Sequence, residues 1–144
     1  MISGFFDPTV SWPVPKVRAA VFLEGVSQRW AVVDFLLDTG AGTTMLSPRD
    51  SLVAVGINPV RLALPQYWSR REESLGIGGA CTVYIVSAQY AFLHDDGEIQ
   101  TLQGEVRVAQ LRSDNQQLPS LLGWDVLQAF DLALHWAGRR ITLQ

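Results

Sequence analysis

The tripeptide Asp38-Thr39-Gly40 stands directly after the apolar run Phe35-Leu36-Leu37 and before the small residues 41–44. A carboxylate at the tip of a buried strand needs hydrogen-bond donors or a partner, because burying an unpaired charge is strongly unfavourable. The hydroxyl residue and the glycine suit a tight turn in which backbone N–H groups approach the carboxylate. The sequence contains this tripeptide once. The pattern predicts a buried strand that delivers one positioned acid.

Two carboxylates held close together can hydrolyse an amide bond, one acting as base toward water and the other as acid. Their mutual repulsion keeps one of them protonated. A tripeptide of this kind also arises by chance in about one chain in ten of this length, and an Asx-type turn would explain it. If the protein hydrolyses amide bonds with a pair of carboxylates, the single copy of the tripeptide means that the second carboxylate comes from another chain.

Composition limits the classes of function. The 144 residues are 48% hydrophobic and 17% charged, as in one globular domain. The net charge is −3 and Lys16 is the single lysine, so the sequence indicates neither a basic patch nor nucleic-acid binding. No apolar run approaches the roughly 18 residues of a membrane span. The lone Cys81 fits a reducing compartment, and two histidines make a transition-metal site a poor expectation. We therefore expect a cytoplasmic protein with no membrane partner, metal or cofactor.

Short hydrophobic segments separated by turn residues predict an all-β domain. Segments 17–23 and 29–37, on either side of a Glu-Gly turn, predict a hairpin whose second strand leads to Asp38. Residues 47–56 predict a helix, with a capping serine and a proline at its start and a glycine at its end. The proline-bounded residues 59–65 predict a loop or a short edge strand.

The termini and the second half of the chain complete this outline. Residues 1–16, which hold three prolines, are expected to form an N-terminal arm, and residues 17–144 the domain itself. Glycines at 76–79 predict a hairpin tip. Further strands are expected at 81–86, 87–93, 104–109 and 140–143, with a polar turn at 94–97 and a strand entering a short helix at 121–130.

The order of these motifs resembles that of the retropepsin-like aspartic proteases, the single-domain family of retroviral proteases and their cellular and bacterial relatives. Three motifs carry the resemblance, Asp38-Thr39-Gly40, Leu75–Gly79 and Leu121-Leu122-Gly123, and it extends over residues 17–143. It implies an all-β, closed barrel-like retropepsin fold with one short C-terminal helix and a flap hairpin. The chain is closer in motif style to the cellular and bacterial members than to the retroviral ones.

The resemblance also assigns roles to individual residues. Asp38 corresponds to the catalytic aspartate, and Thr39 and Gly40 complete the active-site turn. Ala41, together with Ile77, Gly78 and Gly79 at the flap tip, corresponds to residues that contact substrate. The glycines at the tip would also be explained by a tight hairpin turn alone. Residues 121–123 look like the strand behind the active-site turn, and residues 140–144 like the strand that joins an intersubunit sheet in retroviral members.

The chain departs from the retroviral pattern after Gly123. Retroviral enzymes carry an arginine there, where this chain has Trp124, so their arginine brace at the dimer interface cannot form. Asp125 is expected to cap the following helix and to bond nearby backbone. The stretch between the active-site turn and the flap is also longer than in the retroviral enzymes.

These observations lead to one main functional hypothesis and two alternatives. The main one is an aspartic endopeptidase that acts as a homodimer on a peptide or protein, with one Asp38 from each subunit at the twofold axis. Its activity is expected to be highest below neutral pH, where one proton is shared by the pair. One alternative is a catalytically idle, dimeric peptide-binding or scaffolding module of the same fold. The other is a small β-barrel that binds an apolar ligand.

Overall fold

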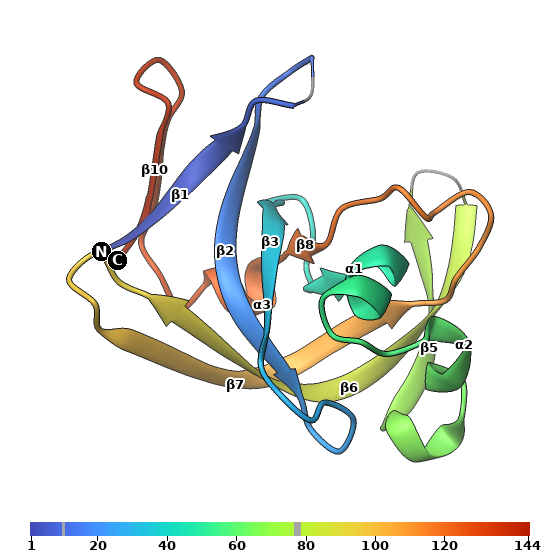
Figure 1. The fold of residues 1–144 in the computed structure, drawn as a ribbon. Helices are drawn as coiled ribbons and strands as arrows, with labels where there is room; N and C mark the ends of the chain where they lie inside the picture. Colours follow the sequence, from blue (N-terminus) through green and yellow to red (C-terminus); the bar gives the residue numbers. More distant parts are fainter. Residues whose placement is uncertain (10, 77–78) are drawn as a thin grey trace.

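The computed structural model describes residues 1–9, 11–76 and 79–144 and is built mainly of β-sheet (Figure 1). Strands hold 48% of the chain and helices 12%, which confirms the mostly β fold expected from the sequence. The described strands form one ten-stranded sheet. They are β1 (Ile2–Asp7), β2 (Val14–Leu23), β3 (Ala31–Leu37), β4 (Met45–Leu46), β5 (Arg70–Gly76), β6 (Gly79–Leu93), β7 (Ile99–Ala109), β8 (Leu121–Leu122), β9 (Leu132–His135) and β10 (Arg140–Leu143).

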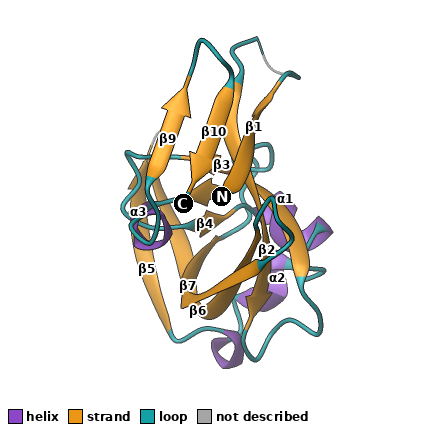
Figure 2. Cartoon of the chain, turned by 90° about the vertical axis from the view of Figure 1, so that its left-hand side faces the viewer, coloured by secondary structure: helices purple, strands orange, loops and turns teal. Residues whose placement is uncertain are grey.

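The sheet closes partly on itself. Its strand order is β5-β6-β7-β4-β8-β3-β2-β1-β10-β9, and β6 also pairs with β2. That extra pairing runs from Ala20 opposite Ala91 to Leu23 opposite Ala88. β5 lies outside the resulting ring on one side, while β1, β10 and β9 extend the sheet beyond β2 and lie side by side in Figure 2. The structure thus has a partly ringed sheet where a closed barrel was expected.

Alternating burial in β2 and β3 explains why these segments form strands. In β3, Val33, Phe35 and Leu37 are buried, whereas the residues between them are half-buried or exposed. This period of two matches a strand with one face on the core. Phe35 and Tyr90 of β6 meet across the core in an edge-on pair, with 6.4 Å between ring centroids. A fully buried aromatic or branched side chain contributes about 2 kcal/mol of transfer free energy, so this inward row stabilises the strand that ends at Asp38.

The described helical segments are short: α1 (Pro48–Val53), α2 (Pro59–Leu62), the 3-10 helix η1 (Pro65–Tyr67) and α3 (Trp124–Leu127). The helix predicted from residue 47 is confirmed as α1. It begins there because the Ser47 side chain accepts a hydrogen bond from Asp50 N–H at 3.2 Å and so caps the helix. The loop or edge strand predicted at 59–65 is wrong. Asn58 caps α2 by accepting from Val60 N–H at 2.9 Å. No helix within the described ranges is long and apolar enough to cross a membrane.

Two other expectations are corrected. The strands predicted separately at 81–86 and 87–93 are one continuous strand, β6, which pairs with β7 along most of its length. The N-terminal arm expected at 1–16 belongs to the sheet instead. Ile2 is buried and pairs with Leu143, and Gly4 packs so closely that a Cβ there would lie 2.7 Å from the Lys16 carbonyl oxygen. The N-terminal residues are therefore part of the sheet rather than a separate arm.

The β1–β2 hairpin contains an ion pair that predicts a pH effect on stability. Asp7 accepts from Lys16 Nζ at 2.7 Å and from the Thr9 hydroxyl at 2.6 Å. The Lys16 hydrogen bond, followed by those from Thr9, holds the pKa of Asp7 well below its usual range. A lowered pKa in the folded state stabilises the fold above the unfolded-state pKa, and this stabilisation is lost as the pH falls toward the folded pKa.

We therefore expect Asp7→Asn to lower the free energy of unfolding more at about pH 6 than at about pH 3. Urea unfolding of the native chain and the variant at both pH values measures the difference. An equal loss at both pH values would show that the ionised carboxylate of Asp7 contributes nothing to stability.

Candidate functional site

Asp38 follows the last residue of β3 at a junction of three strands. β8 lies between β3 and β4, parallel to β3 with Leu37 opposite Leu122, and antiparallel to β4 with Met45 opposite Leu121. The two strands on either side of the Asp38 turn are therefore separated by a strand from far along the chain. This arrangement holds both ends of the turn, residues 38–44, in a fixed frame.

Backbone hydrogen bonds define the shape of the turn. Asp38 N–H donates to the Leu122 carbonyl at 3.2 Å, and Ala41 N–H donates to the Asp38 carbonyl at 3.1 Å. Gly40 N–H donates to Asp38 Oδ1 at 2.9 Å, which is the hydrogen bond among the described residues that holds the carboxylate. Asp38 is half-buried, whereas Thr39 and Gly40 are exposed. The structure therefore brings the predicted residues 38–41 together in one accessible turn.

The contact between Gly40 and Asp38 is that of an Asx turn, since it joins a carboxylate to the N–H two residues on. It fits a structural aspartate as well as a catalytic one. The strands around the turn, rather than this hydrogen bond, distinguish the site from an ordinary surface turn.

Gly123 fits the site because it has no side chain. A Cβ at this position would lie 2.5 Å from the Thr43 carbonyl carbon and 2.6 Å from its oxygen. Its φ of −96° is accessible to any residue, so the requirement is steric. The backbone of β8 and α3 can approach the turn this closely only with glycine at residue 123.

A partly buried hydrogen-bond network joins Thr44, which is buried, to Asp125, which is exposed. The Thr44 hydroxyl donates to Asp125 Oδ1 at 2.7 Å and accepts from Gly123 N–H at 3.0 Å. Thr44 N–H donates to Asp125 Oδ2 at 3.0 Å. Asp125 thus bonds nearby backbone as expected, but its expected capping role is wrong, because Gly123 occupies the N-cap of α3 and no side chain caps it. Sequence reasoning did not identify Thr44, whose partner lies 81 residues away.

Thr44→Val keeps the shape of this side chain and removes its hydroxyl. Thr44 is fully buried, so the change leaves Gly123 N–H and one Asp125 oxygen without their partner. We expect a loss of about 2 kcal/mol in the free energy of unfolding. Urea unfolding measures it, with Thr101→Val on β7, whose side chain is exposed, as the control. Equal unfolding midpoints for the two variants would mean that the network does not stabilise the turn.

Trp124 braces the turn from the other side. Its indole Nε1–H donates to the Thr39 carbonyl at 2.6 Å, and its backbone N–H donates to the Ala41 carbonyl at 2.9 Å. The retroviral arginine brace was expected to be missing here. Trp124 instead supplies a different brace within one chain. Its position directly after Gly123 was the one signal in the sequence that could have pointed to this role.

The hairpin predicted at the glycine-rich segment is confirmed up to its tip. β5 and β6 pair antiparallel as far as Gly76 opposite Gly79, and Gly79 has a φ of +99° that favours glycine. Ile77 and Gly78, predicted to contact substrate, lie outside the described residues. Within the described chain, no hydrogen bond joins Gly79 to the Asp38 turn.

The loop between β7 and β8 supports this hairpin. Arg112 donates to the Ala80 carbonyl, and Asn115 Nδ2 donates to the Gln110 carbonyl at 2.7 Å. Cys81 is half-buried beside Asn115, with 3.8 Å between Sγ and Nδ2. The described polar contacts of this free thiol are with Thr82, Gln110 and Asn115.

The C-terminal strand has no free edge. β10 pairs with β1 on one side and with β9 on the other. In this structure it cannot join an intersubunit sheet in the way that the family resemblance implied. The edge strand at this end of the sheet is β9, residues 132–135, which the sequence did not predict as a strand.

No protein-family model matches the chain, and no curated protein matches it significantly. Within the described ranges, no group of three or more His, Cys, Asp or Glu side chains is placed to hold a metal ion. The geometry around Asp38 is therefore the basis for any assignment of function.

Proposed function

We propose that the chain is a retropepsin-like aspartic endopeptidase that acts as a homodimer, with Asp38 of each subunit forming the catalytic pair. One observation carries this proposal: Asp38 follows β3 at the point where β8 inserts between β3 and β4. A strand frame that fixes a half-buried acid and leaves its turn accessible is suited to positioning a reacting group. The partly ringed sheet supports the finer assignment of a retropepsin fold.

The chemistry requires two carboxyl groups with different protonation states. The ionised Asp38 accepts a proton from water as the water oxygen attacks the peptide carbonyl carbon, and the protonated Asp38 donates its proton to the carbonyl oxygen. Collapse of the resulting tetrahedral diol breaks the C–N bond: the first Asp38 gives the proton it took from water to the leaving nitrogen, and the second Asp38 takes back a hydroxyl proton of the diol. No cofactor enters this sequence of steps.

The single tripeptide makes dimerisation part of the mechanism. A residue near a twofold axis meets its own copy, so one Asp38 per chain supplies both carboxyls. Thr39 and Gly40 are exposed in the single chain, which leaves the turn free to contact a partner. A groove between the subunits would bind an extended peptide by main-chain hydrogen bonds, with Ala41 and Gly79 among its contacts. We include a cytoplasmic location in the proposal because the free thiol of Cys81 suits a reducing compartment.

The Asx-type contact of Gly40 favours one alternative, a dimeric peptide-binding or scaffolding module in which Asp38 has only a structural role. The dependence of hydrolysis on protein concentration distinguishes the peptidase from the scaffolding module. If two chains form one active site, activity per chain falls with dilution below the dimer dissociation constant.

The experiment measures hydrolysis of a fluorogenic peptide library over a dilution series, with mass in solution measured at the same concentrations. We expect specific activity and the dimer fraction to fall together. Hydrolysis by a strict monomer would contradict the proposed catalytic pair, and binding of peptides by a dimer without hydrolysis would favour the scaffolding module.

A further inference from the structure

One cavity lies at the opposite end of β3 from the Asp38 turn. Its volume is about 490 Å³, within the range of sites for small organic ligands. It lies between the β2–β3 connection, which supplies Val26 and Arg29, and the segment from α1 to η1. Since β3 has seven residues, roughly 20 Å of strand separate it from the Asp38 turn. This cavity is not part of the proposed catalytic site.

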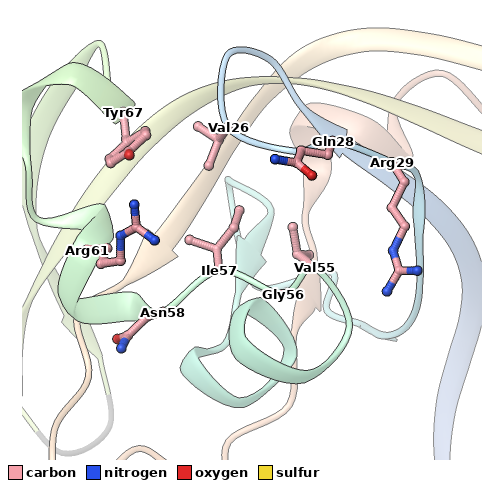
Figure 3. Close-up of a pocket in the computed structure, with 9 residues that line it drawn as sticks. All are labelled: Val26, Gln28, Arg29, Val55, Gly56, Ile57, Asn58, Arg61 and Tyr67. Carbon is pink, nitrogen blue, oxygen red and sulfur yellow. The ribbon is translucent and has the colours of Figure 1, made fainter.

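Apolar side chains form the middle of the cavity, and polar side chains line the rest of it. Val26, Val55 and Ile57 line it, and all three are half-buried against the hydrophobic core. Figure 3 shows Val26 and Ile57 facing each other across its middle. These side chains would bury an aliphatic or aromatic group of a ligand, at about 25 cal/mol per Å² of apolar surface removed from water.

The charge around the cavity is positive. Arg29 and Arg61 line it, and its described lining contains neither aspartate nor glutamate. Neither arginine forms an ion pair within the part of the chain that the structure describes. In Figure 3 the Arg61 guanidinium lies beside Ile57 and Tyr67, whereas that of Arg29 extends away from the centre at the other end.

The environment of Tyr67 agrees with this charge. A side-chain hydrogen bond with Gln66 lowers the pKa of its phenol, and the positive charge of Arg61 lowers it further. Figure 3 shows Arg61 and Tyr67 at the same end of the cavity, so a guanidinium and a phenol O–H can both donate to an anion there. A guanidinium presents a planar fork that matches the two oxygens of a carboxylate.

We propose that this cavity binds a small apolar carboxylate, with the carboxylate at Arg61 and the apolar group between Val26 and Ile57. The ligand is either a free monocarboxylic acid or the C-terminal residue of a peptide, since both present the same chemistry. The site is independent of the proposed peptidase activity. The positive charge of the two arginines that line the cavity is opposite in sign to the net charge of −3 of the chain.

The test is an NMR titration of the ¹⁵N-labelled full chain with N-acetyl-leucine. Controls are N-acetyl-leucinamide, which lacks the charge, and acetate, which lacks the apolar group. We expect saturable shift changes at Val26, Val55 and Ile57, and binding of the amide weaker by about fivefold. A short peptide ending in leucine, with its C-terminal carboxylate either free or amidated, distinguishes the two sources of the ligand. Binding of the peptide with the free carboxylate indicates that the site takes peptide C-termini. Binding of N-acetyl-leucine without binding of this peptide indicates a small-molecule ligand.

Arg61→Gln is the variant, and Arg49→Gln is its matched control. Both arginines are exposed and lie on short helices, but Arg49 does not line the cavity. Loss of the guanidinium at residue 61 should weaken binding about fivefold, and loss at residue 49 should change it less than about twofold. The spectra also report whether each variant is folded. The proposal would be overturned if the acid and the amide bound with equal affinity, or if the two variants weakened binding equally. It would also be overturned if the shift changes centred on residues outside the cavity, or if no carboxylate probe saturated the protein.

Discussion

Asp38→Asn is expected to reduce peptide hydrolysis by about 10⁴-fold, because in a homodimer the substitution removes both carboxyl groups of the proposed pair. The fold should be retained. The amide oxygen of the substituted side chain can still accept the hydrogen bond that Gly40 N–H makes to Asp38 Oδ1, and the backbone bonds of the turn do not involve the side chain. Hydrolysis of a denatured protein, with circular dichroism and mass in solution for each sample, measures the effect.

Asp34→Asn provides the matched control. Asp34 lies on β3, four residues before Asp38, and forms an exposed ion pair with Arg18 at 2.7 Å. Its loss should change activity by less than about fivefold, because exposed ion pairs contribute at most about 1 kcal/mol. Equal hydrolysis by the native chain and by Asp38→Asn would rule out Asp38 as a catalytic residue. No hydrolysis by either would favour the scaffolding module.

Gly123→Ala is expected to lower the free energy of unfolding by about 3 kcal/mol, the upper part of the usual range for overpacking. The added methyl group would meet the Thr43 backbone at 2.5 to 2.8 Å, and backbone atoms cannot move aside as a flexible side chain can. Displacement of Thr43 would also disturb the hydrogen bonds of Thr44 to Asp125 in the next residue. Activity should therefore fall with stability.

Gly42→Ala is the control for this prediction. It lies in the same turn, but nothing lies within 4 Å of a Cβ built there. Its unfolding midpoint in urea should differ little from that of the native chain. If Gly123→Ala unfolds at the same midpoint as Gly42→Ala, the close approach of β8 to the turn is not a requirement of the fold.

The elements predicted correctly from the sequence are those with local causes. Ser47 lies three residues from Asp50, whose N–H donates to it, and the alternation of buried and less buried side chains along β3 lies within seven residues. The helix α2 was missed because its prolines were interpreted as breaking a strand, whereas Pro59 follows a capping Asn58 and occupies the first turn of a helix.

Most of the candidate site depends on contacts that no local pattern encodes. The indole of Trp124 and the carbonyl of Thr39 are 85 residues apart, and Thr44 and Asp125 are 81 apart. The insertion of β8 between β3 and β4 likewise follows from tertiary packing. The arm expected at 1–16 shows the same limit, since three prolines gave no sign that Ile2 would be buried against β10.

The proposed catalytic pair is tested most directly by a crystal structure of the assembled protein, in which the distance between the two Asp38 carboxyl groups is measured. The proposal predicts a twofold dimer in which the nearest carboxyl oxygens lie about 3 Å apart and share a proton. Separation of these oxygens by more than about 10 Å in every assembly that the protein forms would contradict it, because no single proton or water could then serve both groups.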